Sequence, residues 1–411
     1  MRDPALEEVV RQEWGRLVAL LLSQFRRLDL VEDALGDAVE AASRTWPADG
    51  TPDNPAGWLM TAAKRRVLDR LRTEGVAQRK LPMLLTDAEH REEGARTMAD
   101  SGSLVEDDVL RLVLMCAHPA LAPEAAGALS LRLVLGVPTA DIARLFLVPE
   151  PTMAARITRA KKRIVGAGIP FAVPDAAVLP DRLDIVAQTT YLAFTAGYAP
   201  GTGPDLLRAD LSGEAIRLAR VVLGLRPDEP ALVALLALML LQHSRRDARV
   251  RDGRLVLLAD QDRGRWHHDE IAEGTRLLVG PVLAGPVTPL TASYALQARI
   301  AAEHATAPTA DDTRWDRIVG LYDLLLQVSP SPAARLARAV AVAEDRGTAA
   351  GLAALEGLEI PSSHRPAAVR AELLARSGDT DAARAAYDQA IAACGNDVER
   401  EFLERQRETL G

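Results

Sequence analysis

Residues 139 to 164 restrict the fold of this chain more than any other stretch, because apolar side chains recur at helical spacing on both sides of a turn. The apolar side of the first segment is formed by Ile142, Leu145 and Phe146. Breaker residues between Val148 and Pro151 end that segment, and Thr152 is expected to cap the next one. The pattern predicts two helices joined by a tight turn.

The second helix of this pair combines an apolar stripe with a basic face. The stripe recurs at i, i+4, i+7 and i+11 in Met153, Ile157, Ala160 and Ile164. The basic face consists of Thr152, Arg156, Arg159, Lys161, Lys162 and Arg163, with no acidic residue between Pro151 and Ala172. Such a helix fits the major groove of DNA and attracts phosphate. Taken alone, the stretch is equally compatible with a solvated face on an ordinary packed helix.

The net charge of −8 argues against nucleic acid until the chain is divided. Residues 1–168 hold 23 basic and 24 acidic residues, whereas residues 169–411 hold 26 basic and 33 acidic ones. The acidity therefore lies mostly in the C-terminal part, and the basic charge of the N-terminal part is clustered. Because 48% of the residues are apolar but only 4% are aromatic, with Ala, Leu and Arg prominent, we expect an all-α protein.

Cysteine usage and hydropathy predict the compartment. Cys116 and Cys394 lie far apart in apolar helical contexts, which indicates buried thiols in a reducing compartment rather than a disulfide. The sequence shows neither a signal peptide nor a run of 18 apolar residues. We therefore expect a cytoplasmic protein with no membrane partner.

Two further helices upstream carry concentrated charge. Residues 30–46 form an amphipathic helix whose polar face bears Glu32, Asp33, Asp37 and Glu40. Taken without their context, these carboxylates fit a solvated face better than a docking surface for a basic partner. The next helix, Trp58 to Arg72, carries Lys64, Arg65, Arg66, Arg70 and Arg72 opposite an apolar face. Trp58 can stack on an unpaired base, although a Trp at a helix start more often belongs to the core.

An acidic helix followed by two basic helices resembles an extracytoplasmic-function sigma factor of the sigma-70 family. The matching segments are LVEDALGDAVEAASRTWP, NPAGWLMTAAKRRVLDRLR and TADIARLFLVPEPTMAARITRAKKRI. The resemblance implies that core RNA polymerase is bound by Asp33, Asp37 and Glu40. It implies minus-10 promoter contacts for Trp58, Lys64, Arg65, Arg66, Arg70 and Arg72. It implies minus-35 contacts for Thr152, Arg156, Arg159, Lys161, Lys162 and Arg163. Individual base contacts do not transfer, since Gly36, Val39 and Arg65 depart from the usual residues.

The same resemblance divides the chain into four parts. We expect a sigma region 2 domain at 1–74, an acidic linker at 75–107, a sigma region 4 domain with the helix-turn-helix at 108–168, and an extension at 169–411. The extension resembles that of one subgroup and has the pattern of stacked helical hairpins similar to tetratricopeptide repeats. Tyr322 and Tyr387, for example, lie 65 residues apart, close to twice a period of 34. Such a solenoid offers a concave surface for a peptide, a ligand or another domain.

Other clusters in the sequence do not indicate a metal, phosphate or catalytic site. The one that suggests a metal consists of Trp266, His267, His268, Asp269 and Glu270. Adjacent helical residues point in different directions, so no metal site is predicted there. The segment GYAPGTGP at 197–204 lacks the Lys and Ser or Thr of a phosphate loop and fits a turn. No catalytic set stands out, so we expect neither an enzyme nor a cofactor.

The sequence as a whole predicts an alternative sigma factor that recruits core RNA polymerase to promoter DNA. Its extension is expected to contact the sigma domains and modulate them. Two alternatives stay open: a one-component helix-turn-helix repressor with a C-terminal sensor domain, and a repeat scaffold with an incidental basic helix. The sequence identifies no promoter, inducing signal or anti-sigma factor.

Overall fold

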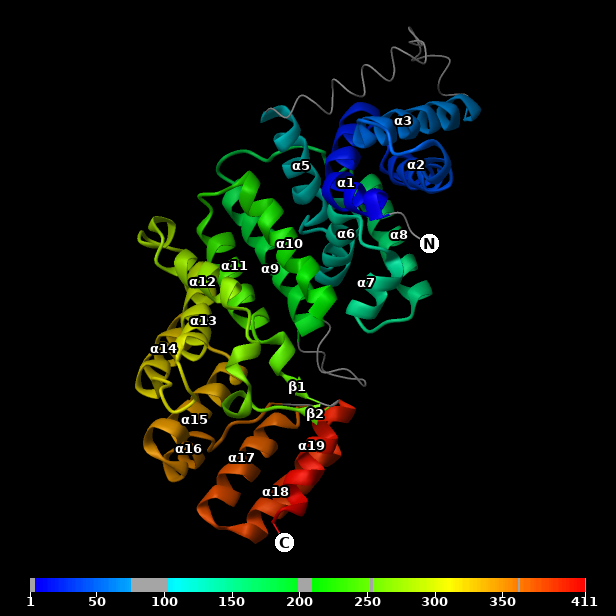
Figure 1. The fold of residues 1–411 in the computed structure, drawn as a ribbon. Helices are drawn as coiled ribbons and strands as arrows, with labels where there is room; N and C mark the ends of the chain where they lie inside the picture. Colours follow the sequence, from blue (N-terminus) through cyan, green and yellow to red (C-terminus); the bar gives the residue numbers. More distant parts are fainter. Residues whose placement is uncertain (1–3, 75–102, 199–208, 252–253, 361–362, 411) are drawn as a thin grey trace. The chain divides into compact units, whose positions relative to one another are not determined.

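Apolar residues at helical spacing form helices along nearly the whole of the chain that the computed structural model describes, residues 4–74, 103–198, 209–251, 254–360 and 363–410 (Figure 1). The predicted all-α class is confirmed. Strands in these ranges are limited to the antiparallel pair β1 (Val250–Arg251) and β2 (Arg254–Leu255). None of the described helices is both long and apolar enough to cross a membrane. Most of the predicted linker, residues 75–102, lies outside the described residues.

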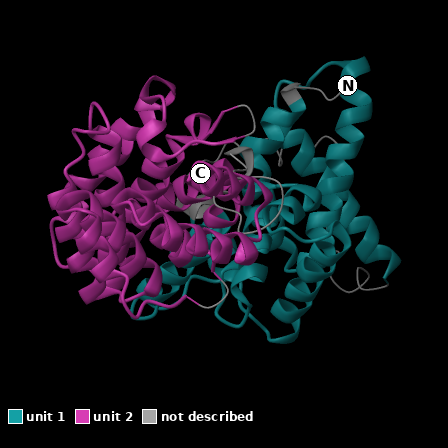
Figure 2. Ribbon diagram, turned by 90° about the horizontal axis from the view of Figure 1, so that it is seen from below, with its two compact units in different colours: residues 1–193 teal, residues 194–411 magenta. Residues whose placement is uncertain are grey.

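The chain divides into two compact units, residues 1–193 and 194–411 (Figure 2). The helices of the first unit are α1 (Pro4–Phe25), α2 (Leu28–Asp49), α3 (Pro55–Thr73), α5 (Ser103–Cys116), α6 (Pro123–Leu135), α7 (Thr139–Leu145), α8 (Glu150–Gly166) and most of α9 (Leu179–Tyr198). α1 packs against α2 and α3 as well as against α5 and α6. The predicted region 2 and region 4 segments therefore share one compact unit.

Residues 169–193, which the sequence assigned to the extension, also belong to the first unit. Arg182 Nη2 donates a hydrogen bond to the carbonyl of Leu114 at 2.6 Å. The guanidinium of Arg26 lies 5.4 Å from the ring centroid of Phe171. The boundary between the units thus falls within α9, later than the predicted domain boundary at residue 168, because α9 begins with buried apolar residues that pack within this unit.

Two helix starts illustrate how sequence signals act in this unit. At α3, Asn54 Oδ1 accepts a hydrogen bond from the backbone N–H of Gly57 at 2.8 Å, and Pro55 occupies the first turn. At α8 the prediction that Thr152 caps the helix is wrong, because the helix begins at Glu150. Pro151 fits inside the first turn, where its missing N–H leaves no helical hydrogen bond unmade.

The second unit is a succession of packed helices. After the end of α9 come α10 (Ala209–Leu225), α11 (Pro230–His243), α12 (His268–Leu278), α13 (Pro289–Thr306), α14 (Trp315–Val328), α15 (Pro332–Arg346), α16 (Thr348–Ala354), α17 (Arg365–Ser377), α18 (Thr380–Ala393) and α19 (Asp397–Glu408). From α13 onward each helix packs on the next. Pro332 lies at the start of α15, and Gly347 ends the helix with a φ of 90°, which suits glycine.

Candidate nucleic-acid interface

The pair α7 and α8 has the predicted form of two helices joined by a tight turn. Leu147 lies in that turn with a positive φ of 55°, and the N–H of Val148 donates to the carbonyl of Ala143 at 3.1 Å. Ile142 and Leu145 of α7 are buried, and α8 packs on both α7 and α6. The turn and the shared core together fix the direction of α8.

One face of α8 is buried and the neighbouring face is open. The predicted apolar stripe is confirmed, since at most 5% of each residue is exposed in Met153, Ile157, Ala160 and Ile164. Exposed residues of the predicted basic face are Thr152, Arg159, Lys162 and Arg163. Arg156 is half-buried. α8 therefore presents an accessible face that carries at least three cationic groups and suits phosphate.

Lys161 differs from the other basic residues of α8. Its ammonium forms an ion pair with the carboxylate of Glu32 on α2, and Arg132 Nε on α6 donates to the same carboxylate at 2.6 Å. Only 5% of Glu32 is exposed. Lys161 follows the buried Ala160, so its side chain projects along the edge of the packed face rather than from the exposed one. In this structure Lys161 is engaged within the protein.

Sequence reasoning placed Glu32 on a polar face and did not single out Arg132. The sequence nevertheless contains a feature that points to the burial of each residue. Arg132 is the one charged residue between Glu124 and Asp141, so it requires a partner inside an apolar environment. Glu32 lies four residues after the buried Leu28, on the face of α2 that packs inward.

The residues predicted to bind polymerase and those predicted to read the minus-10 element meet in one contact. Arg70 of α3 donates to Asp37 at 2.8 Å and to Asp33 at 3.3 Å, both on α2. This bridge helps to hold α2 and α3 together and occupies two of the three predicted carboxylates. The third, Glu40, is two-thirds exposed and pairs weakly with Arg44 at 3.5 Å.

The remaining residues predicted to contact the minus-10 element lie along α3. The half-buried ring of Trp58 packs edge-on against the buried Trp46, with ring centroids 5.6 Å apart. Half-buried along the same helix are Lys64, Arg65 and Arg66. Arg72 is exposed and forms an ion pair with Asp69 at 2.9 Å. Trp58 thus contributes to packing and still keeps part of its surface accessible.

The cluster around Trp266 is an ion-pair network. Arg246 Nη2 donates to Nδ1 of His267 at 3.0 Å, and Nε2 of His267 lies 2.7 Å from Oδ2 of Asp247. His268, the first residue of α12, is exposed. The described residues that converge in a manner suited to a metal are a different group, His364, Cys394 and Glu399, which sequence reasoning did not identify.

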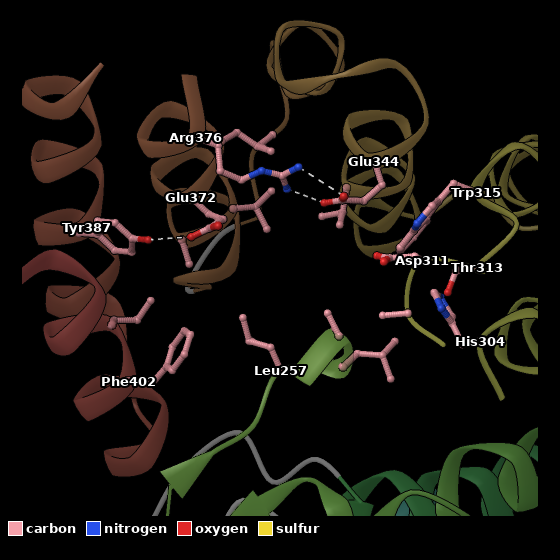
Figure 3. Close-up of a pocket in the computed structure, with 18 of the residues that line it drawn as sticks. Leu257, His304, Asp311, Thr313, Trp315, Glu344, Glu372, Arg376, Tyr387 and Phe402 are labelled. Carbon is pink, nitrogen blue, oxygen red and sulfur yellow. Dashed lines mark hydrogen bonds and ion pairs between the residues drawn. The ribbon is translucent and has the colours of Figure 1, made fainter. Parts of the chain in front are cut away.

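The second unit also contains a cavity of about 720 Å³ (Figure 3). Across it, Arg376 of α17 forms an ion pair with Glu344 of α15 at 2.5 Å, and the hydroxyl of Tyr387 donates to Glu372 at 3.0 Å. The rest of the wall comes from residues 257–263, from α13 and the loop before α14, and from aromatic and aliphatic side chains of α14, α15, α17, α18 and α19. The cavity combines apolar surface with a few polar groups, which is typical of ligand sites.

Two segments of the chain match known protein families. Residues 111–164, which run from the second half of α5 through α6 and α7 to near the end of α8, match the family described as sigma-70, region 4. Residues 182–280 match a family of unknown function, DUF6596. The chain is 41% identical over 395 residues to the uncharacterized protein R00370 of Rhizobium meliloti (strain 1021), which covers 95% of this chain and 92% of that protein. No solved structure matches the chain. The region 4 match supports a DNA-binding role for α7 and α8.

Proposed function

Because the chain belongs to one protein family with R00370 of Rhizobium meliloti and carries a sigma-70 region 4, we propose that it is an alternative sigma factor that directs core RNA polymerase to specific promoters. The observation that carries the proposal is the open basic face of α8. Arg159, Lys162 and Arg163 are exposed there, while the stripe beginning at Met153 is buried inside the matched region. A helix held in this way can enter a major groove without unfolding its own core.

Within this proposal, α8 reads the minus-35 element. Its exposed residues, Arg159 first, contact bases or phosphates directly. Lys161 reaches DNA only after its ion pair with Glu32 breaks. While that pair is intact, Lys161 is not available to contact DNA. Binding to promoter DNA through Lys161 is therefore linked to the breaking of its ion pair with Glu32 on α2.

The first three helices take the remaining sigma roles. α2 contacts core RNA polymerase through its exposed carboxylates. Among these, Glu40 is the most available, because its ion pair with Arg44, at 3.5 Å, is long and exposed. α3 contacts the minus-10 element through its basic residues and the accessible part of Trp58. Arg70 acts mainly by positioning α3 on α2, because both of its contacts lie within the unit.

We assign the chain to the extracytoplasmic-function group and a cytoplasmic location, with a regulatory extension of tetratricopeptide-like hairpins. The consecutive packing of α13 to α19, and the cavity that most of these helices line together with residues 257–263, support this role for the second unit. The extension senses or binds a further molecule and changes the activity of the sigma domains. Nothing in this role requires catalysis.

The test is co-elution of the full-length chain with bacterial core RNA polymerase on size exclusion, followed by run-off transcription from a promoter selected with the complex. We expect a stable complex and promoter-specific transcripts. Replacing Arg159 and Lys162 by Ala should abolish the transcripts but keep the complex, because these residues face DNA rather than polymerase. A chain that binds duplex DNA without polymerase and never co-elutes with it would instead be a repressor.

A further inference from the structure

Three donor groups converge where α17, α18 and α19 meet in the second unit. His364 precedes α17, Cys394 follows α18, and Glu399 lies in the first turn of α19. One donor atom from each lies within 4.8 Å of the other two. His364 Nε2 and Glu399 Oε2 are 3.0 Å apart. Residues 30 and 35 positions apart in the sequence thus bring an imidazole, a thiol and a carboxylate to one point.

The segment between Cys394 and Glu399 is held rigidly. Asn396 is fully buried, and its Oδ1 accepts hydrogen bonds from the N–H groups of Val398 and Glu399 at 3.1 and 3.0 Å. Arg400 Nη2 donates to the carbonyl of Cys394 at 2.6 Å. These contacts fix two of the donors before any ligand arrives, which lowers the entropic cost of binding.

We propose that His364, Cys394 and Glu399 form a Zn²⁺ site. Nitrogen, thiolate sulfur and carboxylate oxygen are the donors that Zn²⁺ takes in proteins, and soft thiolate favours it over Mg²⁺ or Ca²⁺. Three protein ligands leave the fourth tetrahedral position to water. One thiolate and one carboxylate balance the double charge of the ion, so the loaded site is neutral.

The distances suit insertion of the ion. With metal–ligand bonds of about 2.0 to 2.1 Å, tetrahedral N and O ligands lie about 3.3 Å apart, only slightly more than the observed separation of His364 and Glu399. Zn²⁺ would replace the direct contact between His364 and Glu399. The proton of the Cys394 thiol would leave to solvent, and the proton on Nε2 of His364 would leave to solvent or give way to the tautomer protonated at Nδ1. Arg365 lies 3.5 Å from Oε1 of Glu399, the other carboxylate oxygen, so Oε2 stays available to the ion.

The site adjoins the wall of the cavity. Cys394 belongs to the same apolar cluster as Tyr387 and Leu403, and both of these line the cavity. Zn²⁺ would fasten the ends of three helices whose side chains shape that wall. The proposed ion would therefore affect the shape of the cavity wall in the last helices of the extension, independent of whether the chain acts as a sigma factor.

The experiment uses the full-length chain, freed of metal with a chelator and titrated with Zn²⁺ by calorimetry and with Co²⁺ by absorption. We expect one equivalent of either ion and, for Co²⁺, a thiolate charge-transfer band in the near ultraviolet. Cys394→Ser should remove that band, and His364→Gln or Glu399→Gln should each weaken binding by at least about tenfold. Zn²⁺ should also raise the melting temperature of the wild-type chain.

Two control variants and a test of folding accompany the binding experiment. Cys116→Ala removes the other thiol, and His268→Gln removes an exposed imidazole; both should bind like the wild type. Far-UV circular dichroism tests whether each variant is folded. If Cys394→Ser does not fold, Glu399→Gln takes its place in the binding experiment. Absence of stoichiometric binding, or a thiolate band that persists in folded Cys394→Ser, overturns the proposal.

Discussion

Lys161 and Glu32 form an ion pair between α8 and α2, although they lie 129 positions apart in the sequence. The carboxylate is buried and also accepts a hydrogen bond from Arg132. Two cations of the region 4 segment therefore share one anion of α2. The helix proposed to read DNA and the helix proposed to bind polymerase are joined by this contact, and a change at Glu32 should affect both.

Replacing Glu32 by Gln should destabilise the first unit by about 3 kcal/mol. This value is the lower end for breaking a buried ion pair, because the side chains of Lys161 and Arg132 each keep about a fifth to a quarter of their surface exposed. The measurement is differential scanning calorimetry of the full-length chain, following the transition of the first unit. Glu40→Gln is the control and should stay within about 0.5 kcal/mol of wild type. Equal effects of the two changes would show that the pair contributes nothing.

The rate at which the thiol of Cys116 is labelled should also depend on the ion pair of Glu32. Its thiol is fully buried, and burial raises its pKa well above the ordinary value, with the nearby Glu32 adding to the effect. In a Cys394→Ser background, labelling of Cys116 at pH 8 therefore requires opening of the first unit. We expect Glu32→Gln to accelerate labelling at least about tenfold, because a loss of about 1.4 kcal/mol in the free energy of opening raises the open population by that factor. An unchanged rate would mean that Cys116 is exposed by a motion that leaves the pair intact.

Arg156 and Arg159 should matter for promoter recognition. Replacing both by Ala should weaken promoter binding by about 2 to 6 kcal/mol if both read bases. Arg156 is half-buried, so the single Arg159→Ala change should leave the fold of α8 less disturbed and serve as the cleaner variant. Footprinting of the minus-35 region checks the effect, with Arg276→Ala, an exposed change in the second unit, as the control. Full protection by the double variant would remove α8 from minus-35 recognition.

The predictable parts of this structure are those that a local pattern determines. The stripe from Met153 to Ile164 fixed which face of α8 is buried, since helical spacing alone sets that outcome. The same spacing cannot identify a partner on another helix. Glu32, Arg132 and Lys161 meet only through tertiary packing, and so do His364, Cys394 and Glu399. The start of α8 was misplaced because Pro151 acts both as a breaker and as a residue favoured in the first turn.

His304, which lines the cavity of the second unit, should make stability depend on pH. Burial lowers its pKa to about 4, and the positive charges of Arg245 and Arg263 act in the same direction. In the unfolded chain a histidine takes up its proton near pH 6.5, so between pH 6.5 and 4 the unfolded state binds more protons. The free energy of unfolding of the second unit should therefore fall as the pH is lowered through this window.

The loss should reach about 3 kcal/mol at pH 4, slightly less than the full pKa difference is worth, because the imidazole of the folded state is itself half protonated there. Carboxylates lose stability in the same direction at low pH, so the effect of His304 is obtained as the difference between wild type and His304→Gln. That variant should show a flatter dependence from pH 6.5 to 4, whereas the exposed change His268→Gln should follow the wild-type curve. Parallel curves for wild type and His304→Gln would mean that water reaches the imidazole and hydrates its charged form, and the cavity wall beside Trp315 would then be open to solvent.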